Sequence, residues 1–329
     1  MPTKTLAEQT VDLIREHGKA ALEHAKVSMQ KEKVAYKPLQ EALYYFVDEF
    51  FKDISQPGLL SLYCEAIGGD PRETTKVGGA MVLLVSAADL HDDIIDNSKT
   101  KGGRLTVLGK FGKELAILAG DAFLVKGLFL LHEVTEDLPE QKRAAVLNLI
   151  KQAFFDLSST EAEEAHCCKK NNLTGQQYLE ILKRKTAVSE ATARIGAILG
   201  NGTTQEIETL GDIGITMSLV NTIRDEFIDI FEAEELRTRT ARGVLPLPLL
   251  FAFQDPKKEE AITRLLKDGR ITKELTEEIV NIVMAAEETE NLRNLMRSQI
   301  RDCVGQLVSL ESGTEALKLV LESALEDLQ

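Results

Sequence analysis

Two acidic clusters carry the residue types and spacing expected of a metal-dependent active site. Each has three acidic residues at positions i, i+1 and i+4, namely Asp92, Asp93 and Asp96 in the first and Asp225, Glu226 and Asp229 in the second. On a helix, residues at i and i+4 lie one turn apart on the same side, with the i+1 residue beside them. Carboxylates held this close repel one another unless water, protons or cations compensate their charge.

Divalent cations account for such clusters well. Mg²⁺ prefers carboxylate oxygens and keeps water and substrate phosphates as its remaining ligands. A single cluster is also compatible with a solvated helix end in an acidic protein. The second cluster favours the metal interpretation, because two carboxylate-bearing helices that face each other across a cavity can hold Mg²⁺ and a diphosphate between them.

The segments that carry the clusters are predicted to be helical. Residues 77–91 are apolar on all sides, Pro71 is well placed to begin their helix, and no turn signal precedes Asn97. The second cluster belongs to an apolar-periodic helix from about Thr204 to Glu234. Between the two, residues 97–112 are rich in glycine and lysine, and we expect a loop that closes over the site.

The rest of the chain has the same helical character. Further helices are predicted over residues 5–33, 38–51, 57–67 and 114–131, from Pro139 to about Cys168, and from a cap at Thr174 to Gly200. An arginine-rich loop with Arg237, Arg239 and Arg242 is expected next, and charged helices follow from Pro256. Strand signals and Pro/Gly/Ser linkers are missing. We therefore predict an all-α fold and a single domain over residues 1–329.

Composition excludes several classes of partner. The chain has 39 Lys and Arg against 53 Asp and Glu, a net charge of −14, and no basic stripe with aromatics, which argues against nucleic acid. The longest apolar stretch, 117–131, is interrupted by Asp121 and Lys126, so we expect no transmembrane segment. No secretory segment begins the chain. The four cysteines lack disulfide or zinc spacing, which favours a reducing, cytoplasmic location.

Four segments, in this order, resemble the trans-prenyl diphosphate synthases: His91 to Asp96, Phe111 to Asp121, Lys185-Thr186, and Asp225 to Asp229. The resemblance implies the all-α isoprenoid synthase fold, a single helical bundle around a deep apolar cavity, usually in a homodimer. It also implies a prenyltransferase that ionises an allylic prenyl diphosphate, with three Mg²⁺ held between the two clusters and the diphosphate. Metal ions and cationic side chains spread the charge of the leaving diphosphate, and a dry apolar wall protects the resulting cation from water.

The resemblance assigns roles to individual positions. The implied Mg²⁺ ligands are Asp92, Asp93, Asp96, Asp225, Glu226 and Asp229, with Glu226 standing where the family has aspartate. The implied catalytic residues are Asp92, Asp93, Asp96 and Lys185. Diphosphate contacts are expected from Lys101, Lys185, Thr186 and Arg237. Ala87 and Ala88 replace bulky residues that limit chain length in the family, which implies a cavity deep enough for long substrates.

The implied site for isopentenyl diphosphate, the second substrate, departs from the family pattern. Basic or histidine residues of the family are replaced here by Asp53, Gln56, Val85 and Gly102. Charge-assisted contacts are the strong ones, so these replacements should weaken binding of a trianionic ligand. Alternatively, Lys52, Arg104 or Arg237 could reach this diphosphate from other directions and substitute for the missing basic residues.

The sequence leaves three hypotheses. The preferred one is an enzyme whose allylic cation is captured by an acceptor other than isopentenyl diphosphate, or by cyclisation. The second is an ordinary chain-elongating synthase with a rebuilt isopentenyl site. The third is a non-catalytic subunit of a heteromer, and the intact first cluster argues against it, because a scaffold has no need of mutually repulsive carboxylates.

Overall fold

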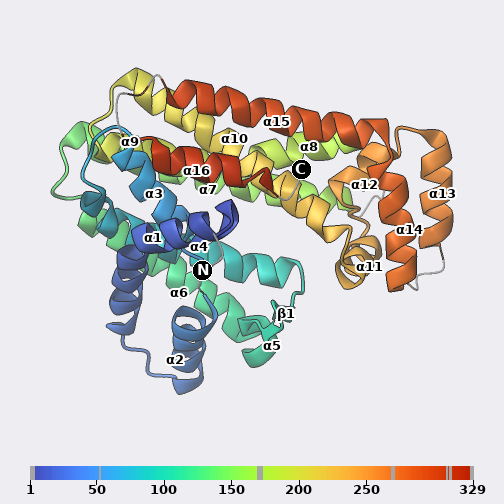
Figure 1. Cartoon of the computed structure of the whole chain (residues 1–329). Helices are drawn as coiled ribbons and strands as arrows, with labels where there is room; N and C mark the ends of the chain where they lie inside the picture. Colours follow the sequence, from blue (N-terminus) through green and yellow to red (C-terminus); the bar gives the residue numbers. More distant parts are fainter. Residues whose placement is uncertain are drawn as a thin grey trace. The chain divides into compact units, whose positions relative to one another are not determined.

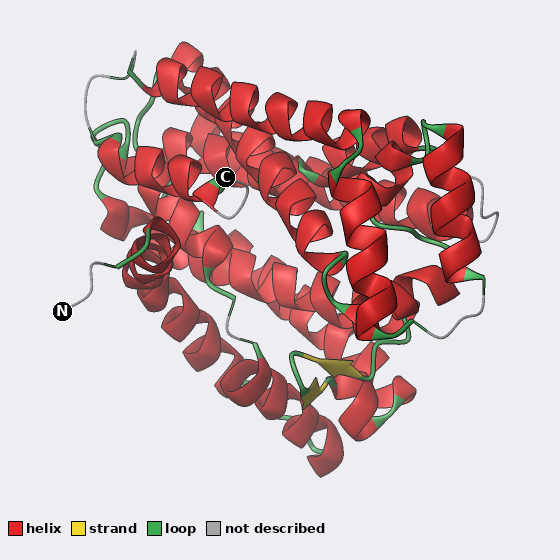
Figure 2. Cartoon of the chain, turned by 45° about the vertical axis from the view of Figure 1, so that its right-hand side comes forward, coloured by secondary structure: helices red, strands yellow, loops and turns green. Residues whose placement is uncertain are grey.

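The computed structural model describes residues 4–51, 53–168, 173–267, 271–308, 310 and 313–326, nearly all of them helical (Figure 1). Within these ranges the strands are β1 (Thr100–Lys101) and β2 (Arg104–Leu105), which pair antiparallel as a short hairpin (Figure 2). The predicted all-α fold is confirmed. Contacts divide the chain into two compact units, which are described separately below, and the prediction of a single domain stays a prediction.

The N-terminal unit comprises Glu8–Asn148 and Thr192–Ile207. Its elements, in chain order, are most of α1 (Leu6–Gln30), α2 (Lys37–Tyr44), the π-helix η1 (Tyr45–Phe50), α3 (Ser55–Glu65), the 3₁₀ helix η2 (Pro71–Thr74), α4 (Thr75–Ile95), the hairpin, α5 (Val107–Phe111), α6 (Lys113–Val134) and the start of α7 (Glu140–Cys168). The last turns of α9 (Ala187–Leu199) also belong to this unit.

Helices α4 and α6 pack closely because glycines on α6 leave room for side chains of α4. A Cβ atom at Gly120 would lie 2.5 Å from His91 Nε2, and one at Gly127 would lie 2.8 Å from Leu84 Cδ2. Both spacings are seven residues, two helical turns, so the two contacts repeat along one face of each helix. This packing fixes the end of α4, where the first acidic cluster lies.

One described helix, α6, is long and apolar enough to cross a membrane by length and composition, and 39% of its most apolar window is buried. Part of that apolar surface faces outward, with Phe129 72% exposed. The helix predicted over residues 114–131 is therefore present, but it is exposed on this face, whereas its apolar composition favours a buried helix. The expected absence of a transmembrane segment stays a prediction.

The C-terminal unit comprises Met1–Ala7, Leu149–Ala191 and Glu208–Gln329. Its elements are the rest of α7, α8 (Gly175–Lys185), the start of α9, most of α10 (Thr204–Asp229), α11 (Ala233–Arg242), α12 (Leu247–Ala252), α13 (Pro256–Leu266), α14 (Lys273–Met284), α15 (Glu287–Leu307) and α16 (Glu315–Ser323). Helices α12, α13 and α14 gather at one end of α15 (Figure 1). A core from α10 to α14 holds them, with Ile230, Leu236, Leu249, Ile262, Ile279 and Val283 fully buried.

Side-chain caps fix where several elements begin. Thr174 forms a capping box with Gln177 at the start of α8, as the sequence indicated. Asp70, Thr106 and Asp255 accept hydrogen bonds from backbone N–H groups at the starts of η2, α5 and α13. These caps satisfy N–H groups that the helices leave without partners.

Three predicted boundaries were wrong. The helix expected from Thr174 to Gly200 is interrupted at Thr186, which lies between α8 and α9. The helix of the second cluster ends at Asp229, and the arginine-rich segment expected as a loop is helix α11. The loop expected over 97–112 contains the hairpin and α5.

The cysteines agree with reduced thiols as far as they are described. Cys64 and Cys303 are buried and free, and Cys167 is free and partly buried. The side chain of Cys168 lies outside the described residues, as does Lys52. The cytoplasmic location stays a prediction.

Candidate functional site

The first acidic cluster lies at the C-terminal end of α4. Asp92 and Asp93 belong to the last turn, and Asp96 follows the helix, its N–H donating to the carbonyl oxygen of Asp92 at 2.8 Å. The chain then turns at Asn97, where φ is 53°. Because a helix C-terminus carries partial negative charge, three carboxylates at this place are unfavourable without a nearby cation.

Asp93 is the buried member of this cluster. Its side chain is 3% exposed, and its Oδ2 has no hydrogen-bond partner among the described residues. Burial first, and then the charges of Asp89, Asp92 and Asp96, raise the pKa of Asp93 to about 7, while Lys101 opposes the shift. A buried acceptor without a donor is costly, and a divalent cation would supply the missing partner. The first cluster therefore fits Mg²⁺.

Lys101, a predicted diphosphate contact, pairs with a carboxylate that the sequence analysis did not single out. Its Nζ lies 2.5 Å from Asp89 Oδ1. Asp89 precedes Asp92, Asp93 and Asp96 at i, i+3, i+4 and i+7, so it extends the acidic face of α4 by one turn. This helical spacing could have identified Asp89 as a member of the acidic face from the sequence.

Three of the four positions that depart from the family pattern, Asp53, Val85 and Gly102, line one cavity of the N-terminal unit. This cavity, of about 480 Å³, is lined by Phe50, Phe51, Asp53, Val85, Asp89, Lys101, Gly102 and Arg104. Arg104 donates from Nη1 to the carbonyl oxygen of Glu49 at 3.1 Å. The lining thus holds two carboxylates and two cations, whereas the family pattern predicted a cationic site.

Two of the departing side chains have local structural partners. Asp53 Oδ1 accepts a hydrogen bond from the Ser55 N–H at 2.8 Å, at the start of α3. Gln56 Oε1 accepts from the Thr192 hydroxyl on α9 at 2.6 Å. Both side chains therefore help to hold the elements of the N-terminal unit in place.

The second acidic cluster, at the end of α10, is organised by Arg239 of α11. Arg239 Nη2 lies 2.9 Å from Glu226 Oε2, and Nη1 lies 2.8 Å from Asp229 Oδ2. Glu226 is buried and also accepts from the Tyr178 hydroxyl at 3.0 Å and from the Leu247 N–H at 2.8 Å. Both Glu226 oxygens therefore have protein donors. This geometry does not fit the predicted role of Glu226 as a metal ligand.

The outer members of the second cluster differ from each other. Asp225 is 64% exposed and lies 3.2 Å from its neighbour Arg224. Asp229 is partly buried, and burial raises its pKa to about 6, although Arg239 opposes the shift. Asp225 is thus the cluster's most accessible carboxylate.

Arg237, a predicted diphosphate contact, is a surface residue. Its side chain is 56% exposed, and its guanidinium lies 3.6 Å from Glu234. Arg239, two positions on, lies on the other side of α11 with the buried Leu236. From the sequence, Arg239 was predicted only as part of an arginine-rich loop, without a role in the site. The i, i+3 spacing from Leu236 was the signal that would have found it.

Lys185 ends α8 and is held by two glutamates of α7. Its Nζ lies 3.1 Å from Glu161 Oε1 and also contacts Glu164 Oε2. Burial lowers the pKa of Lys185, but the charges of Glu164 and Glu161 outweigh it and raise the pKa above the usual range. Thr186 is 3% exposed and donates its hydroxyl to the Lys183 carbonyl. Neither glutamate was singled out from the sequence.

The predicted chain-length positions lie on the same helix as the first cluster. Ala87 is fully buried and Ala88 is partly buried. Small side chains at both places are thus seen in the structure, and their role in chain length stays a prediction.

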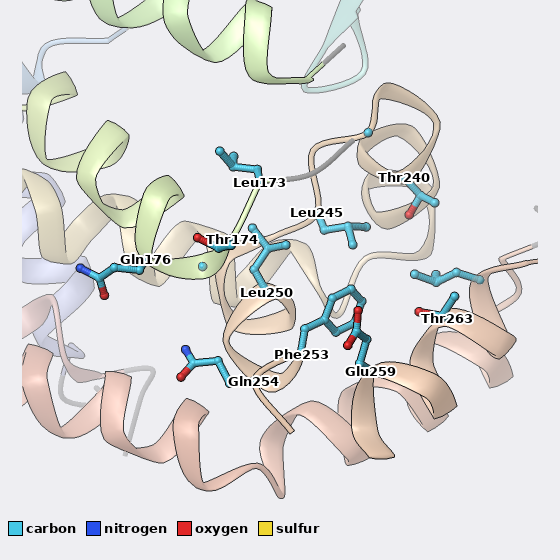
Figure 3. Close-up of a pocket in the computed structure, with 13 residues that line it drawn as sticks. Leu173, Thr174, Gln176, Thr240, Leu245, Leu250, Phe253, Gln254, Glu259 and Thr263 are labelled. Atoms are coloured by element: carbon cyan, nitrogen blue, oxygen red, sulfur yellow. The ribbon is translucent and has the colours of Figure 1, made fainter. Parts of the chain in front are cut away.

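A larger cavity, of about 730 Å³, lies in the C-terminal unit between the start of α8, the α11–α12 connection and α13 (Figure 3). Its lining is uncharged apart from Glu259 and mixes apolar side chains, such as Leu250 and Phe253, with polar ones, such as Gln176 and Gln254. Because no described lining residue is a cation, this cavity does not suit a diphosphate.

In the part of the chain that is described, no three His, Cys, Asp or Glu side chains converge as a ready-made metal site. Mg²⁺ does not require one, because it binds through one or two carboxylates together with water and substrate phosphates. The carboxylates of α4 satisfy that weaker requirement.

Comparison with known proteins gives consistent matches. A family model described as polyprenyl synthetase matches residues 37–283. The short chain isoprenyl diphosphate synthase of Methanothermobacter thermautotrophicus is 26% identical over 328 residues, which cover 97% of this chain and 98% of the relative. The geranylgeranyl diphosphate synthase of Methanosarcina mazei is 26% identical over 270 residues, covering 80% and 81%.

Solved structures share the fold. The geranylgeranyl pyrophosphate synthetase of Pyrococcus horikoshii matches with a TM-score of 0.85 and 23% identity, covering 97% of this chain and 99% of that one. A polyprenyl synthase of Caulobacter crescentus, complexed with calcium and isoprenyl diphosphate, matches with a TM-score of 0.80 and 20% identity, covering 98% and 99%. The predicted isoprenoid synthase fold is confirmed.

Proposed function

Because the chain belongs to the polyprenyl synthetase family, we propose that it is a prenyl diphosphate synthase that elongates an allylic diphosphate with isopentenyl diphosphate. Family membership confirms the predicted enzyme class, a prenyltransferase acting on allylic diphosphates. The names of the curated relatives favour chain elongation, the second of the three hypotheses. They do not support capture by another acceptor or cyclisation, which was the preferred one.

The observation that carries the proposal is the buried Asp93 carboxylate in the first cluster, with an oxygen that lacks a protein donor. We propose that Asp92, Asp93 and Asp96 hold Mg²⁺ together with the allylic diphosphate. When bound, Mg²⁺ would stabilise the charge that develops on the leaving diphosphate. Lys185, already positioned by α7, would bind a diphosphate as a point charge.

We propose that isopentenyl diphosphate binds in the cavity lined by Asp53, Val85 and Asp89, with Lys101 and Arg104 as its cations. Arg104 would replace basic residues that the family pattern has and this chain lacks, whereas Lys101 stands where the pattern itself has a basic residue. Phe50 and Phe51 would exclude water from the acceptor's apolar part.

A second candidate function rests on the two carboxylates of that cavity. Asp53 and Asp89 balance the charges of Lys101 and Arg104, and a charge-balanced cavity suits an acceptor that carries less negative charge than a diphosphate. On this view the allylic diphosphate is still ionised, and the acceptor differs.

We propose that the protein forms a homodimer through α6. Five large apolar side chains of this helix are at least 38% exposed, namely Ile117, Leu118, Val125, Leu128 and Phe129. Their positions repeat at three, four and seven residues, so they form a stripe along one side. In a two-fold symmetric dimer, the stripe of one subunit would pack against the same stripe of the other and bury its apolar surface.

Thermal unfolding tests the proposed metal and diphosphate site. Wild type should gain a few degrees in Tm with Mg²⁺ and inorganic diphosphate together, because both bind the folded state. In Asp92→Asn this gain should be lost, while the exposed Asp137→Asn on the α6–α7 turn should keep it. An equal gain in all three proteins would contradict the proposed site.

A further inference from the structure

The second acidic cluster already contains a cation. Arg239 is only 12% exposed, and its guanidinium donates to Glu226, Asp229 and the Tyr178 hydroxyl. Its Nε also donates to the Val244 carbonyl at 3.1 Å. These hydrogen bonds hold the planar guanidinium in one place. Two of the three acidic side chains of the cluster are thereby neutralised in part by one fixed positive charge.

A divalent ion at this place competes with the guanidinium. Both Glu226 oxygens and one Asp229 oxygen already accept hydrogen bonds from protein donors. A metal ion close enough to bind these carboxylates would also lie within a few ångströms of the Arg239 charge, and like charges at such distances repel strongly in a partly buried site. The guanidinium stays charged at all accessible pH values, so it does not yield by losing a proton.

An ion that displaced Arg239 would also break the packing of this region. Removal of Arg239 would leave Glu226 as a buried charge without its partner, which is strongly destabilising. Glu226 is 6% exposed and also holds the first residue of α12 through the Leu247 N–H. The packing of α10, α11 and α12 therefore depends on the same ion pair.

We propose that Arg239 takes the place of one divalent cation at the second acidic cluster, so that this chain binds at most two divalent ions with its substrate diphosphate rather than three. The inference rests on the proposed function, because it concerns the divalent ions that would bind with the substrate diphosphate. In this proposal Glu226 and Asp229 bind the guanidinium of Arg239, and Asp225 remains the carboxylate of the cluster that a metal ion can reach.

Ion counting tests the proposal. Mn²⁺ bound per chain is measured by equilibrium dialysis with electron paramagnetic resonance detection, at saturating inorganic diphosphate. Wild type should bind no more than two Mn²⁺, and Arg239→Gln should bind one more than wild type. Adding Asp229→Asn to Arg239→Gln should remove the extra ion. Arg237→Gln, the matched control on the exposed side of α11, should bind the same number as wild type.

The outcomes separate this proposal from the proposed function. Three Mn²⁺ in wild type, or no gain in a folded Arg239→Gln, would overturn the role of Arg239 and leave the enzyme assignment intact. No diphosphate-dependent Mn²⁺ in wild type would overturn both. If Arg239→Gln does not fold, as judged by circular dichroism, the wild-type count decides: one or two bound Mn²⁺ supports the proposal and three overturns it.

Discussion

Asp93 links the stability of the N-terminal unit to pH. Its pKa is raised to about 7 in the folded protein, chiefly by burial, against an ordinary value of 3.8. Between pH 4 and pH 7 the folded state keeps this proton and the unfolded state releases it. The unfolded state then binds fewer protons, so the contribution of Asp93 to stability falls as pH rises through this window.

Asp93→Asn should remove that pH dependence. Without divalent ions, the variant's free energy of unfolding should exceed the wild-type value by about 1–3 kcal/mol at pH 8 and differ little near pH 4. Urea unfolding at both pH values measures the difference. A difference that does not grow with pH would contradict the assigned cause.

The sequence predicted the acidic residues of the site better than their partners. Carboxylates at i, i+1 and i+4 are visible in one segment of sequence, and both clusters lie on helices as expected. Arg239, by contrast, reaches Glu226 only because α11 turns back toward α10. That contact depends on tertiary packing, which local spacing does not report. The same holds for Lys185 and Glu161 on α8 and α7.

The α4–α6 pair depends on glycine at its closest contact. At Gly127 an added Cβ would lie 2.8 Å from Leu84 Cδ2 and 3.1 Å from the Leu84 backbone nitrogen. Gly127→Ala should therefore lower the free energy of unfolding by about 1–3 kcal/mol, because overpacking displaces the helices. Urea unfolding measures this.

Gly305→Ala is the matched control, because nothing lies within 4 Å of its added Cβ on α15. There the change should stabilise the protein by up to about 1 kcal/mol, since alanine favours helix. Equal effects at the two positions would mean that close packing of α4 on α6 is not what requires Gly127.

Long helices were predicted well, and short elements were not. The apolar stretches that form α4 and α6 extend over many residues without a turn signal, a length typical of buried helices and too great for a strand. The hairpin strands have two residues each, too few for an alternating pattern. Its turn, however, has Gly102 and Gly103 at φ 56° and 73°, and a Gly-Gly pair is a recognised two-residue hairpin signal. The break at Thr186 leaves no such signal in sequence.

Dimerisation through α6 is testable at its most exposed residue. Phe129 is 72% exposed, and Phe129→Asp would place a charge within the proposed apolar interface. We expect wild type to be a dimer and the variant a monomer by light scattering at micromolar concentration. Val11→Asp, at a 52% exposed position on α1, should remain dimeric. A monomeric wild type would contradict the proposed interface.

The overall fold and the enzyme class were predictable because they rest on several motifs in a fixed order. The acceptor was not, since the residues that departed from the family pattern led to a preference that the names of the relatives do not support. The structure places Asp53, Val85 and Gly102 around one cavity but adds Asp89, Lys101 and Arg104 to its wall. Which acceptor such a mixed cavity binds depends on small differences between opposing charges.

Incorporation of labelled isopentenyl diphosphate tests the central claim directly. The protein is incubated with Mg²⁺, radiolabelled isopentenyl diphosphate, and unlabelled geranyl or farnesyl diphosphate, and the products are separated by chain length. The proposed function predicts label in a longer allylic diphosphate, only when both substrates and Mg²⁺ are present. Release of inorganic diphosphate from the allylic substrate without incorporation of label would contradict chain elongation and favour another acceptor or cyclisation.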